Sequence, residues 1–242
     1  MFLSRIKDDL SPKWATPLIF DFDPAENDTI TVCIYDHNSK ADDVPMTPGI
    51  SINLLQVIEE STKQGEECPF VLGETSVGSP TLFVYAYESQ SIEETVSLKL
   101  RARHVKNVEQ GILGFGKTDP YLEIYKQHFY PELGRSHWLL VHRTEHIDDH
   151  LNPVWKEITK TTEELCDGDW DRSLRITLVD FERRRKHRTL GHVETTLNQL
   201  KECIAIKGNG DLSNSLIFLK DGCDTGSKKG VGNLIVMDFE EL

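Results

Sequence analysis

The densest cluster of charge in this sequence is the basic run from Phe181 to Arg188. Guanidinium groups bind phosphate bidentately, and a cation held against an anionic leaflet contributes about 1 kcal/mol. The run therefore predicts a loop that binds phosphate or anionic phospholipid directly, with a solvated basic loop as the alternative. Its five permanent cations are Arg183, Arg184, Arg185, Lys186 and Arg188.

A second pattern, from Gly111 to Thr118, fits the phosphate loop of nucleotide-binding domains. The residues before it alternate between apolar and polar, whereas a buried parallel strand would be continuously apolar. Pro120 follows two residues after Thr118. The residues after it alternate like a strand, whereas a phosphate loop would be followed by a helix. A nucleotide-binding domain is therefore the disfavoured alternative.

Two metal-binding patterns also occur. His142 to His146 fits H-x-x-E-H, which binds zinc only from a helix, but its surroundings predict a strand and a turn. Asp167, Asp169 and Asp171 resemble the start of an EF-hand loop, yet Arg172 stands where glycine is needed. No nucleophile and base have a recognisable spacing, so we expect no enzymatic activity.

The composition excludes several classes of protein. A net charge of −13 argues against a nucleic-acid-binding protein, which would need a basic face. Five scattered cysteines without a C-x-x-C pair favour reduced thiols in an intracellular compartment. No apolar run approaches the roughly 18 residues of a spanning helix, and no signal peptide opens the chain.

Alternating apolar residues predict an all-β fold with antiparallel sheets. Two short helices are expected, at 54–63 and at 161–166, the second capped by Thr161 or Thr162. The later part of the chain carries eight predicted strands, enough for a two-sheet sandwich. They lie near 96–105, 120–126, 138–145, 154–161, 172–180, 190–197, 215–220 and 231–239.

The chain also contains an internal repeat, because residues 6–14 echo residues 147–155 at a separation of about 140 residues. The segment 117–200 closely resembles the second C2 domain of copines. The resemblance is carried by His142 to Glu145, Leu151 to Trp155, and Leu165 to Asp171. It implies two C2-type β-sandwiches in tandem. The von Willebrand factor A-like domain of copines has no counterpart in these residues.

The resemblance implies that acidic loops at one end of each sandwich bind Ca²⁺. In the second domain the matching acids are Asp119, Asp180 and Glu182. Leu113 and Arg188 stand where two further acids belong, which weakens the expected calcium site. In the first domain Asp36 and Asn38 match.

We expect a partial first C2 domain over residues 1–92 and a complete second one over 93–242. Only nine residues precede Leu10, so the first domain lacks its first strands and its first calcium loop. Its strands are expected near 17–23, 29–36, 49–53, 69–72 and 81–88. An incomplete sandwich exposes strand edges that can pair with another chain.

The resemblance implies calcium-dependent phospholipid binding at the cytoplasmic face of the plasma membrane by a peripheral protein. The expected partners are anionic phospholipid membranes and possible protein partners, not nucleic acid. The alternative function is a calcium-independent protein-interaction module.

Overall fold

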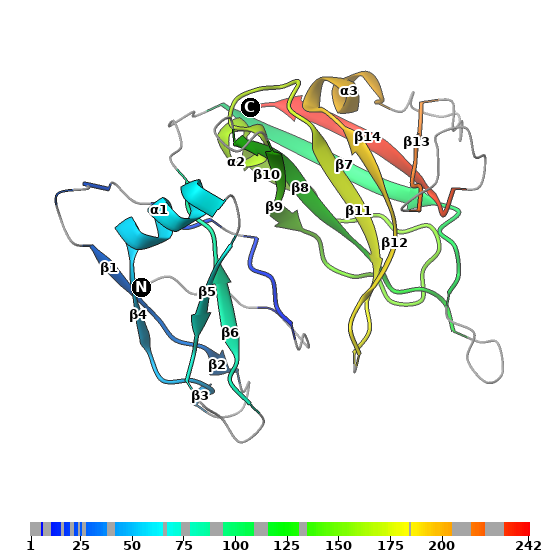
Figure 1. The fold of residues 1–242 in the computed structure, drawn as a ribbon. Coiled ribbons are helices and arrows are strands. Elements are labelled where there is room, and N and C mark those ends of the chain that lie inside the picture. The colour runs from blue at the N-terminus through cyan, green and yellow to red at the C-terminus, as the bar shows by residue number, and fades with distance from the viewer. Residues whose placement is uncertain are drawn as a thin grey trace. The chain divides into compact units, whose positions relative to one another are not determined.

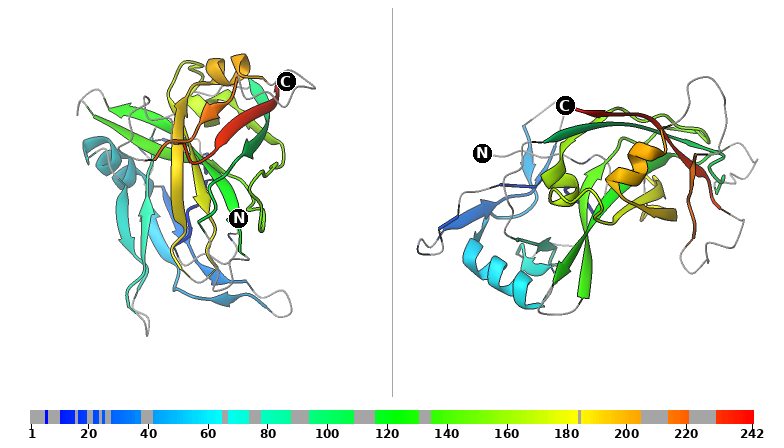
Figure 2. Two further views of the ribbon diagram at one scale, coloured as in Figure 1. Left: turned by 90° about the vertical axis from the view of Figure 1, so that its right-hand side faces the viewer. Right: turned by 90° about the horizontal axis from the view of Figure 1, so that it is seen from above.

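The computed structural model describes residues 6, 11–15, 17–19, 22–23, 25, 28–37, 42–64, 67–73, 78–87, 94–108, 116–130, 135–183, 185–204, 214–220 and 230–242. The chain divides into two compact units. Unit 1 comprises Met1–Leu18, Ser89–His128 and Trp138–Leu242, and unit 2 comprises Ile19–Glu88 and Phe129–His137. Figures 1 and 2 show their elements from three directions.

Unit 1 is built on two four-stranded sheets whose paired strands run antiparallel (Figure 1). One sheet has the order β10 (Ile158–Thr161), β7 (Thr95–Arg103), β14 (Asn233–Glu241), β13 (Leu216–Ile217). The other has the order β12 (Arg188–Thr195), β11 (Leu174–Asp180), β8 (Pro120–Tyr130), β9 (Arg135–Arg143). The predicted all-β fold is confirmed, and each of the eight predicted strands has a counterpart.

The core of unit 1 lies between these sheets, because alternate residues of each strand point inward. Leu98 and Leu100 of β7 are buried with Leu122 of β8, Ile176 of β11 and Val236 of β14. A fully buried side chain of this size contributes roughly 1.5–3 kcal/mol relative to exposure. The residues of β8 and β11 that alternate with these core residues therefore point to the outer face of the sheet.

The Asn-Pro-x-Trp motif fixes the entry to β10. Trp155 is 1% exposed, and its indole N–H donates to the carbonyl of Pro120 at 3.3 Å. Its main-chain N–H donates to the carbonyl of Leu100 at 3.2 Å, which ties the motif to β7. The indole thus packs in the core with its polar atom paired, as a buried tryptophan requires.

Two short helices cover the strand ends of unit 1. Helix α2 (Thr162–Cys166) is capped by Thr161, one of the two predicted caps, and Thr161 also forms a capping box with Glu164. Helix α3 (Leu197–Glu202) was not predicted; Thr196 caps it by accepting the N–H of Gln199. Both caps satisfy N–H groups that the first turn leaves unpaired.

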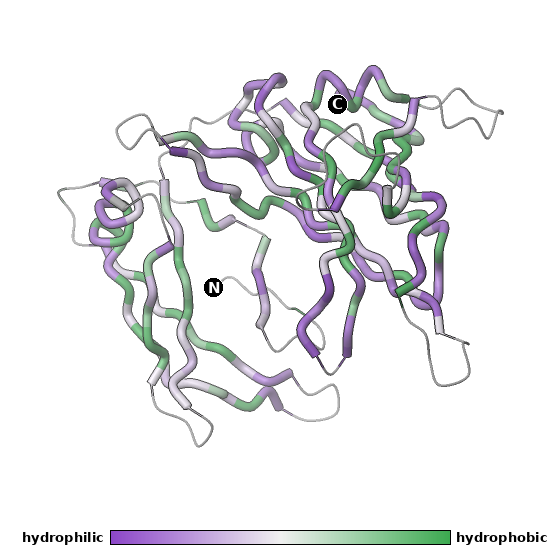
Figure 3. The backbone as a smooth tube through the Cα atoms, turned by 45° about the vertical axis from the view of Figure 1, so that its right-hand side comes forward, coloured by the Kyte–Doolittle hydropathy of each residue, from purple (hydrophilic) through white to green (hydrophobic). Residues whose placement is uncertain are grey.

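The described residues of unit 2 form three two-stranded ladders and one longer helix. Strand β1 (Thr29–Val32) pairs with β4 (Ile50–Asn53), β2 (Tyr35–Asp36) with β3 (Val44–Pro45), and β5 (Cys68–Val71) with β6 (Thr81–Val84). Helix α1 (Leu54–Gln64) alternates between hydrophobic and hydrophilic stretches (Figure 3). Its Val57 joins Ile52 and Cys68 in a small core.

The strand predicted over residues 17–23 is wrong, since the described residues of that range carry no strand. Its counterpart in the repeat is β10, which exists by pairing with β7. The predicted strand over 29–36 is also divided into β1 and β2, and β3 was missed.

The four cysteines within the described ranges, Cys33, Cys68, Cys166 and Cys203, are free thiols. Burial raises the pKa of Cys166 to about 11, which keeps this thiol protonated and poorly reactive. Among the described residues, no helix is long and apolar enough to cross a membrane.

Candidate functional site

The predicted acids Asp119 and Asp180 lie side by side in unit 1. Asp119 directly precedes β8 and Asp180 ends β11, and the ladder sets Asp180 opposite Pro120. The main-chain N–H of Asp119 donates to Oδ1 of Asp180 at 2.9 Å. Two carboxylates far apart in sequence are thereby fixed at the same end of one sheet, as predicted from the sequence.

The carboxylate of Asp119 organises the neighbouring turn. Its Oδ1 accepts the main-chain N–H of Asp149 at 2.6 Å. The Asp149 carboxylate in turn accepts the N–H of Lys117 at 3.0 Å, and Asp149 has a positive φ of 51°. One oxygen of Asp119 therefore holds a strained turn in place and is already engaged by a donor.

Asp180 is fully buried, and its Oδ2 has no hydrogen-bond partner among the described residues. Burial raises the pKa of Asp180, and Glu182 and Asp119 raise it further; the Asp119 amide and Arg188 act in the opposite direction. Burial likewise raises the pKa of Asp119, with Asp148 and Asp149 adding to the effect. This end of the sheet is thus rich in negative charge that a cation would relieve.

The described residues alone do not fit a calcium cage. Calcium takes six to eight oxygens, and no group of three or more His, Cys, Asp or Glu side chains in the described ranges is arranged to hold a metal ion. Oδ2 of Asp180 has no hydrogen-bond partner among the described residues, whereas Oδ1 of Asp119 already accepts the Asp149 N–H. Leu113, which stands at one of the missing acidic positions, lies outside the described residues.

The basic loop, residues 181–188, has a stack of rings at its base. Phe181 is stacked on His146 at 4.0 Å between centroids and on His187 at 4.8 Å. The N–H of Phe181 donates to the Asp119 carbonyl at 3.0 Å, and the N–H of Glu182 donates to Nδ1 of His187 at 3.0 Å. The first residue of the loop is therefore bonded to the Asp119 backbone, and the two sides of the loop are bonded to each other.

Beyond this stack the loop presents its cations. Arg183, Arg185, Lys186 and Arg188 are exposed, and Arg184 lies outside the described residues. Figure 3 shows both described arms of this loop as hydrophilic. Arg188 stands opposite Asp180 in the β11–β12 ladder, after a register shift at Leu178/Val179, and donates to the Val108 carbonyl at 3.4 Å. The loop can engage phosphate oxygens without an intervening metal.

The two acidic positions predicted in the first copy belong to unit 2. Asp36 lies on β2 and is exposed, opposite Val44 of β3. Asn38 lies outside the described residues. Nearby, His37 and Asp43 form a close contact of 2.6 Å between Nδ1 and Oδ1.

The disfavoured motifs have structural roles. Lys117 and Thr118 lead into strand β8, not a helix, so the phosphate-loop interpretation fails. His142 lies on strand β9, which excludes the helical zinc motif. Asp167 ends α2 with a positive φ of 52° and pairs with Lys126 at 2.5 Å and Arg172 at 2.8 Å.

Sequence reasoning missed a second polar cluster on the outer face of the β8–β11 sheet. Glu123 and Tyr125 of β8 face a pocket together with Arg175 of β11 and Trp138 of β9. The available signal was the alternation of β8, which places Tyr121, Glu123 and Tyr125 on one face.

The family of the chain follows from comparison with known proteins. A family model described as C2 domain matches residues 2–68 and 96–210, more than half of the chain. Similar solved structures include the C2B domain of BON1, with 26% identity, a TM-score of 0.46, and coverage of 62% of this chain and 92% of that one. A single C2 domain of plant extended synaptotagmin 1 has 19% identity, a TM-score of 0.40, and coverage of 61% and 93%. A chain of extended synaptotagmin 2 that joins an SMP domain to two C2 domains has 16% identity, a TM-score of 0.36, and coverage of 67% and 31%.

Proposed function

The chain belongs to the C2 domain family and carries tandem C2 domains, and from this premise we propose that unit 1 binds anionic phospholipid membranes through its basic loop, residues 181–188. The observation that carries the proposal is the exposure of Arg185 and Lys186 beyond the Phe181 stack. A loop anchored at its base presents these cations with less conformational entropy to lose on binding.

In this proposal calcium contributes little to the binding of lipid by unit 1. A calcium-dependent site gathers carboxylates to hold a bridging ion. Here Arg188 faces Asp180 across the ladder, and Asp119 is engaged by the Asp149 amide. In place of calcium, the guanidinium groups of the basic loop neutralise the lipid phosphate.

We further propose that the protein is copine-like and acts at the cytoplasmic face of the plasma membrane, where anionic lipids are concentrated. The support is the set of motifs that resemble the second copine C2 domain: His142 to Glu145, Leu151 to Trp155, and Leu165 to Asp171. The protein in this proposal is a binding module without enzymatic activity.

Sedimentation with phosphatidylserine-containing vesicles in excess chelator tests the proposal. The full chain is expected to sediment without calcium, and Arg185→Ala/Lys186→Ala is expected to lower the affinity about fivefold per cation removed. A matched control, Lys156→Ala/Lys201→Ala, removes the same charge elsewhere on unit 1 and should bind more tightly than the loop variant.

Two results would contradict the proposal. One is equal binding by the loop variant and the matched control, which would mean that total charge alone governs association. The other is binding that requires calcium and is insensitive to both double substitutions, which would assign the interaction to a metal site.

A further inference from the structure

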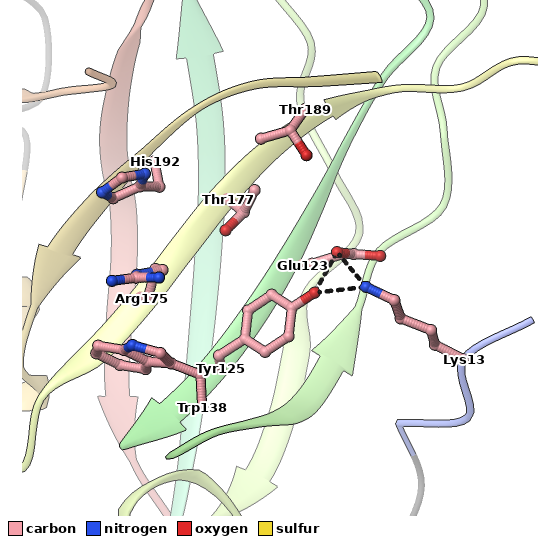
Figure 4. Close-up of a pocket in the computed structure, with 8 residues that line it drawn as sticks. All are labelled: Lys13, Glu123, Tyr125, Trp138, Arg175, Thr177, Thr189 and His192. Atoms are coloured by element: carbon pink, nitrogen blue, oxygen red, sulfur yellow. Dashed lines mark hydrogen bonds and ion pairs between the residues drawn. The ribbon is translucent and has the colours of Figure 1, made fainter. Parts of the chain in front are cut away.

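The pocket on the outer face of the β12-β11-β8-β9 sheet encloses about 210 Å³ (Figure 4). Its walls come from Glu123 and Tyr125 of β8, Trp138 of β9, and Arg175 of β11. Lys13 of the N-terminal segment, which belongs to unit 1, reaches into it. The pocket lies on the opposite side of the sheet from the core.

A buried carboxylate forms the floor of the pocket. Glu123 is 5% exposed, and its Oε1 accepts from the Arg143 guanidinium at 2.6 Å. Although burial acts to raise the pKa of Glu123, the Tyr125 hydroxyl, Lys13 and Arg143 together hold that pKa below its ordinary value. The floor therefore carries a negative charge.

Tyr125 and Glu123 together provide acceptor oxygens for an ammonium group. Its hydroxyl donates to Oε2 of Glu123 at 2.5 Å, which leaves the hydroxyl oxygen free to accept. Nζ of Lys13 donates to that oxygen at 3.1 Å and lies 3.6 Å from Oε2 of Glu123. It also lies 5.6 Å from the centroid of the Tyr125 ring, within the range of a cation–π contact.

Two guanidinium groups, Arg175 in the pocket wall and Arg143 bound to Glu123, do not compete for this position. Arg143 is bound to Glu123, and Arg175 binds Glu194 at 2.7 Å while stacking on Trp138 at 4.3 Å. An anion entering the pocket would have to approach the Glu123 carboxylate. The charges and donors thus favour a primary ammonium group over a phosphate or carboxylate ligand.

The segment that carries Lys13 departs from its counterpart in the repeat. Lys13 corresponds to Val154, which bridges to Arg101 of β7, and Trp14 corresponds to the core residue Trp155. Trp14 is 36% exposed, whereas Trp155 is 1% exposed. Lys13 itself is not part of a strand, and its ammonium group contacts Tyr125 and Glu123 of the pocket.

We propose that this pocket is a lysine-binding site, occupied by Lys13 of the same chain and able to take the lysine of another extended polypeptide when Lys13 is removed. The ligand is a lysine side chain on a short, Pro-containing segment such as residues 10–15. Pro12 fixes its own φ and restricts Ser11 before it to extended geometry, which keeps the segment that carries the lysine extended.

A binding experiment with the full chain tests this site. The probe is a fluorescent peptide with the sequence of residues 10–15, and binding is measured by anisotropy. Lys13→Met removes the ammonium group from Tyr125 and Glu123 while retaining an aliphatic stem, so this variant should bind the peptide about fivefold more tightly than the wild type, and adding Tyr125→Phe should reverse the gain. A peptide with acetylated lysine should lose the same affinity.

Equal binding by the wild type and Lys13→Met would overturn the proposal, as would equal binding of the acetylated peptide. A second measurement guards against a folding defect in the double variant. Trypsin should cleave after Lys13 about fivefold faster in Tyr125→Phe than in the wild type, relative to cleavage after Lys63. An unchanged ratio would show that the pocket does not hold Lys13.

Discussion

Arg188 lies directly opposite Asp180 in the β11–β12 ladder, at the point where the two strands enter the basic loop. Burial, Glu182 and Asp119 raise the pKa of Asp180, and Arg188 counteracts part of that effect. A permanent cation thus stands beside the one buried carboxylate oxygen at this site that has no hydrogen-bond partner in the described residues.

Replacing this cation should restore calcium binding. Arg188→Asp adds a carboxylate beside Asp180, so millimolar calcium should raise the Tm of the variant by about 3 °C, as expected for saturation at about ten times Kd. The wild type should change by less than about 1 °C. Differential scanning calorimetry measures the shift, with Lys156→Asp as the charge-matched control; equal shifts in both variants would contradict the prediction.

The raised pKa of Asp180 predicts a pH-dependent difference in stability. Asp180→Asn keeps an oxygen for the Asp119 N–H and removes the buried charge, so the variant should be about 1 kcal/mol more stable near neutral pH. Because the folded state holds the proton more tightly, the stability contributed by protonated Asp180 is present below the ordinary pKa of 3.8 and is lost as pH rises through the folded pKa. Urea unfolding across this range should show the gap closing in acid; a constant gap would refute this account.

The ion pair between Lys126 and Asp167 should respond asymmetrically to substitution. Lys126 is 1% exposed, so Asp167→Asn leaves a buried cation without its carboxylate and should cost about 3–5 kcal/mol. Lys126→Met fills the same space and leaves Asp167 paired with Arg172, so its cost should be under about 1.5 kcal/mol. Chemical denaturation of both variants checks the order, and the reverse order would contradict it.

The two repeated tryptophans offer an internal comparison. Trp155→Ala should cost about 3–5 kcal/mol, because it opens a cavity in the core and removes the contact with the Pro120 carbonyl. Trp14→Ala should change stability by less than about 0.5 kcal/mol, as expected for an exposed position outside that core. Thermal unfolding of the two variants measures the difference, and similar losses would mean that Trp14 is buried in solution.

The strands of unit 1 were predictable because each alternates in the manner of a sheet with one buried face. Leu98, Leu100 and Ile176 point into the core as their period-2 pattern indicates. Helix α3 was missed because it has 6 residues, and its signal in the sequence was the N-cap residue Thr196. The strand predicted at 17–23 does not form in the described residues of that range, so an apolar pattern alone does not specify a strand.

The acidic site was predictable in part. The approach of Asp119 to Asp180 follows from two strand ends in one antiparallel pair. The sequence could not indicate that the Asp119 carboxylate binds the Asp149 amide, since that bond depends on a turn with positive φ. The pocket around Glu123 also escaped prediction, because its contact with Lys13 joins residues 110 positions apart.

The hydrogen bond from the Glu182 N–H to Nδ1 of His187 has a consequence for the shape of the basic loop. Nδ1 of His187 acts as the acceptor in this bond, so the two sides of the loop are joined across its base. The cations of Arg183, Arg185 and Lys186 therefore lie on a short segment between two hydrogen-bonded residues. Such a closed loop has few ways to spread its cations apart, which sets the size of the anionic group that it can contact.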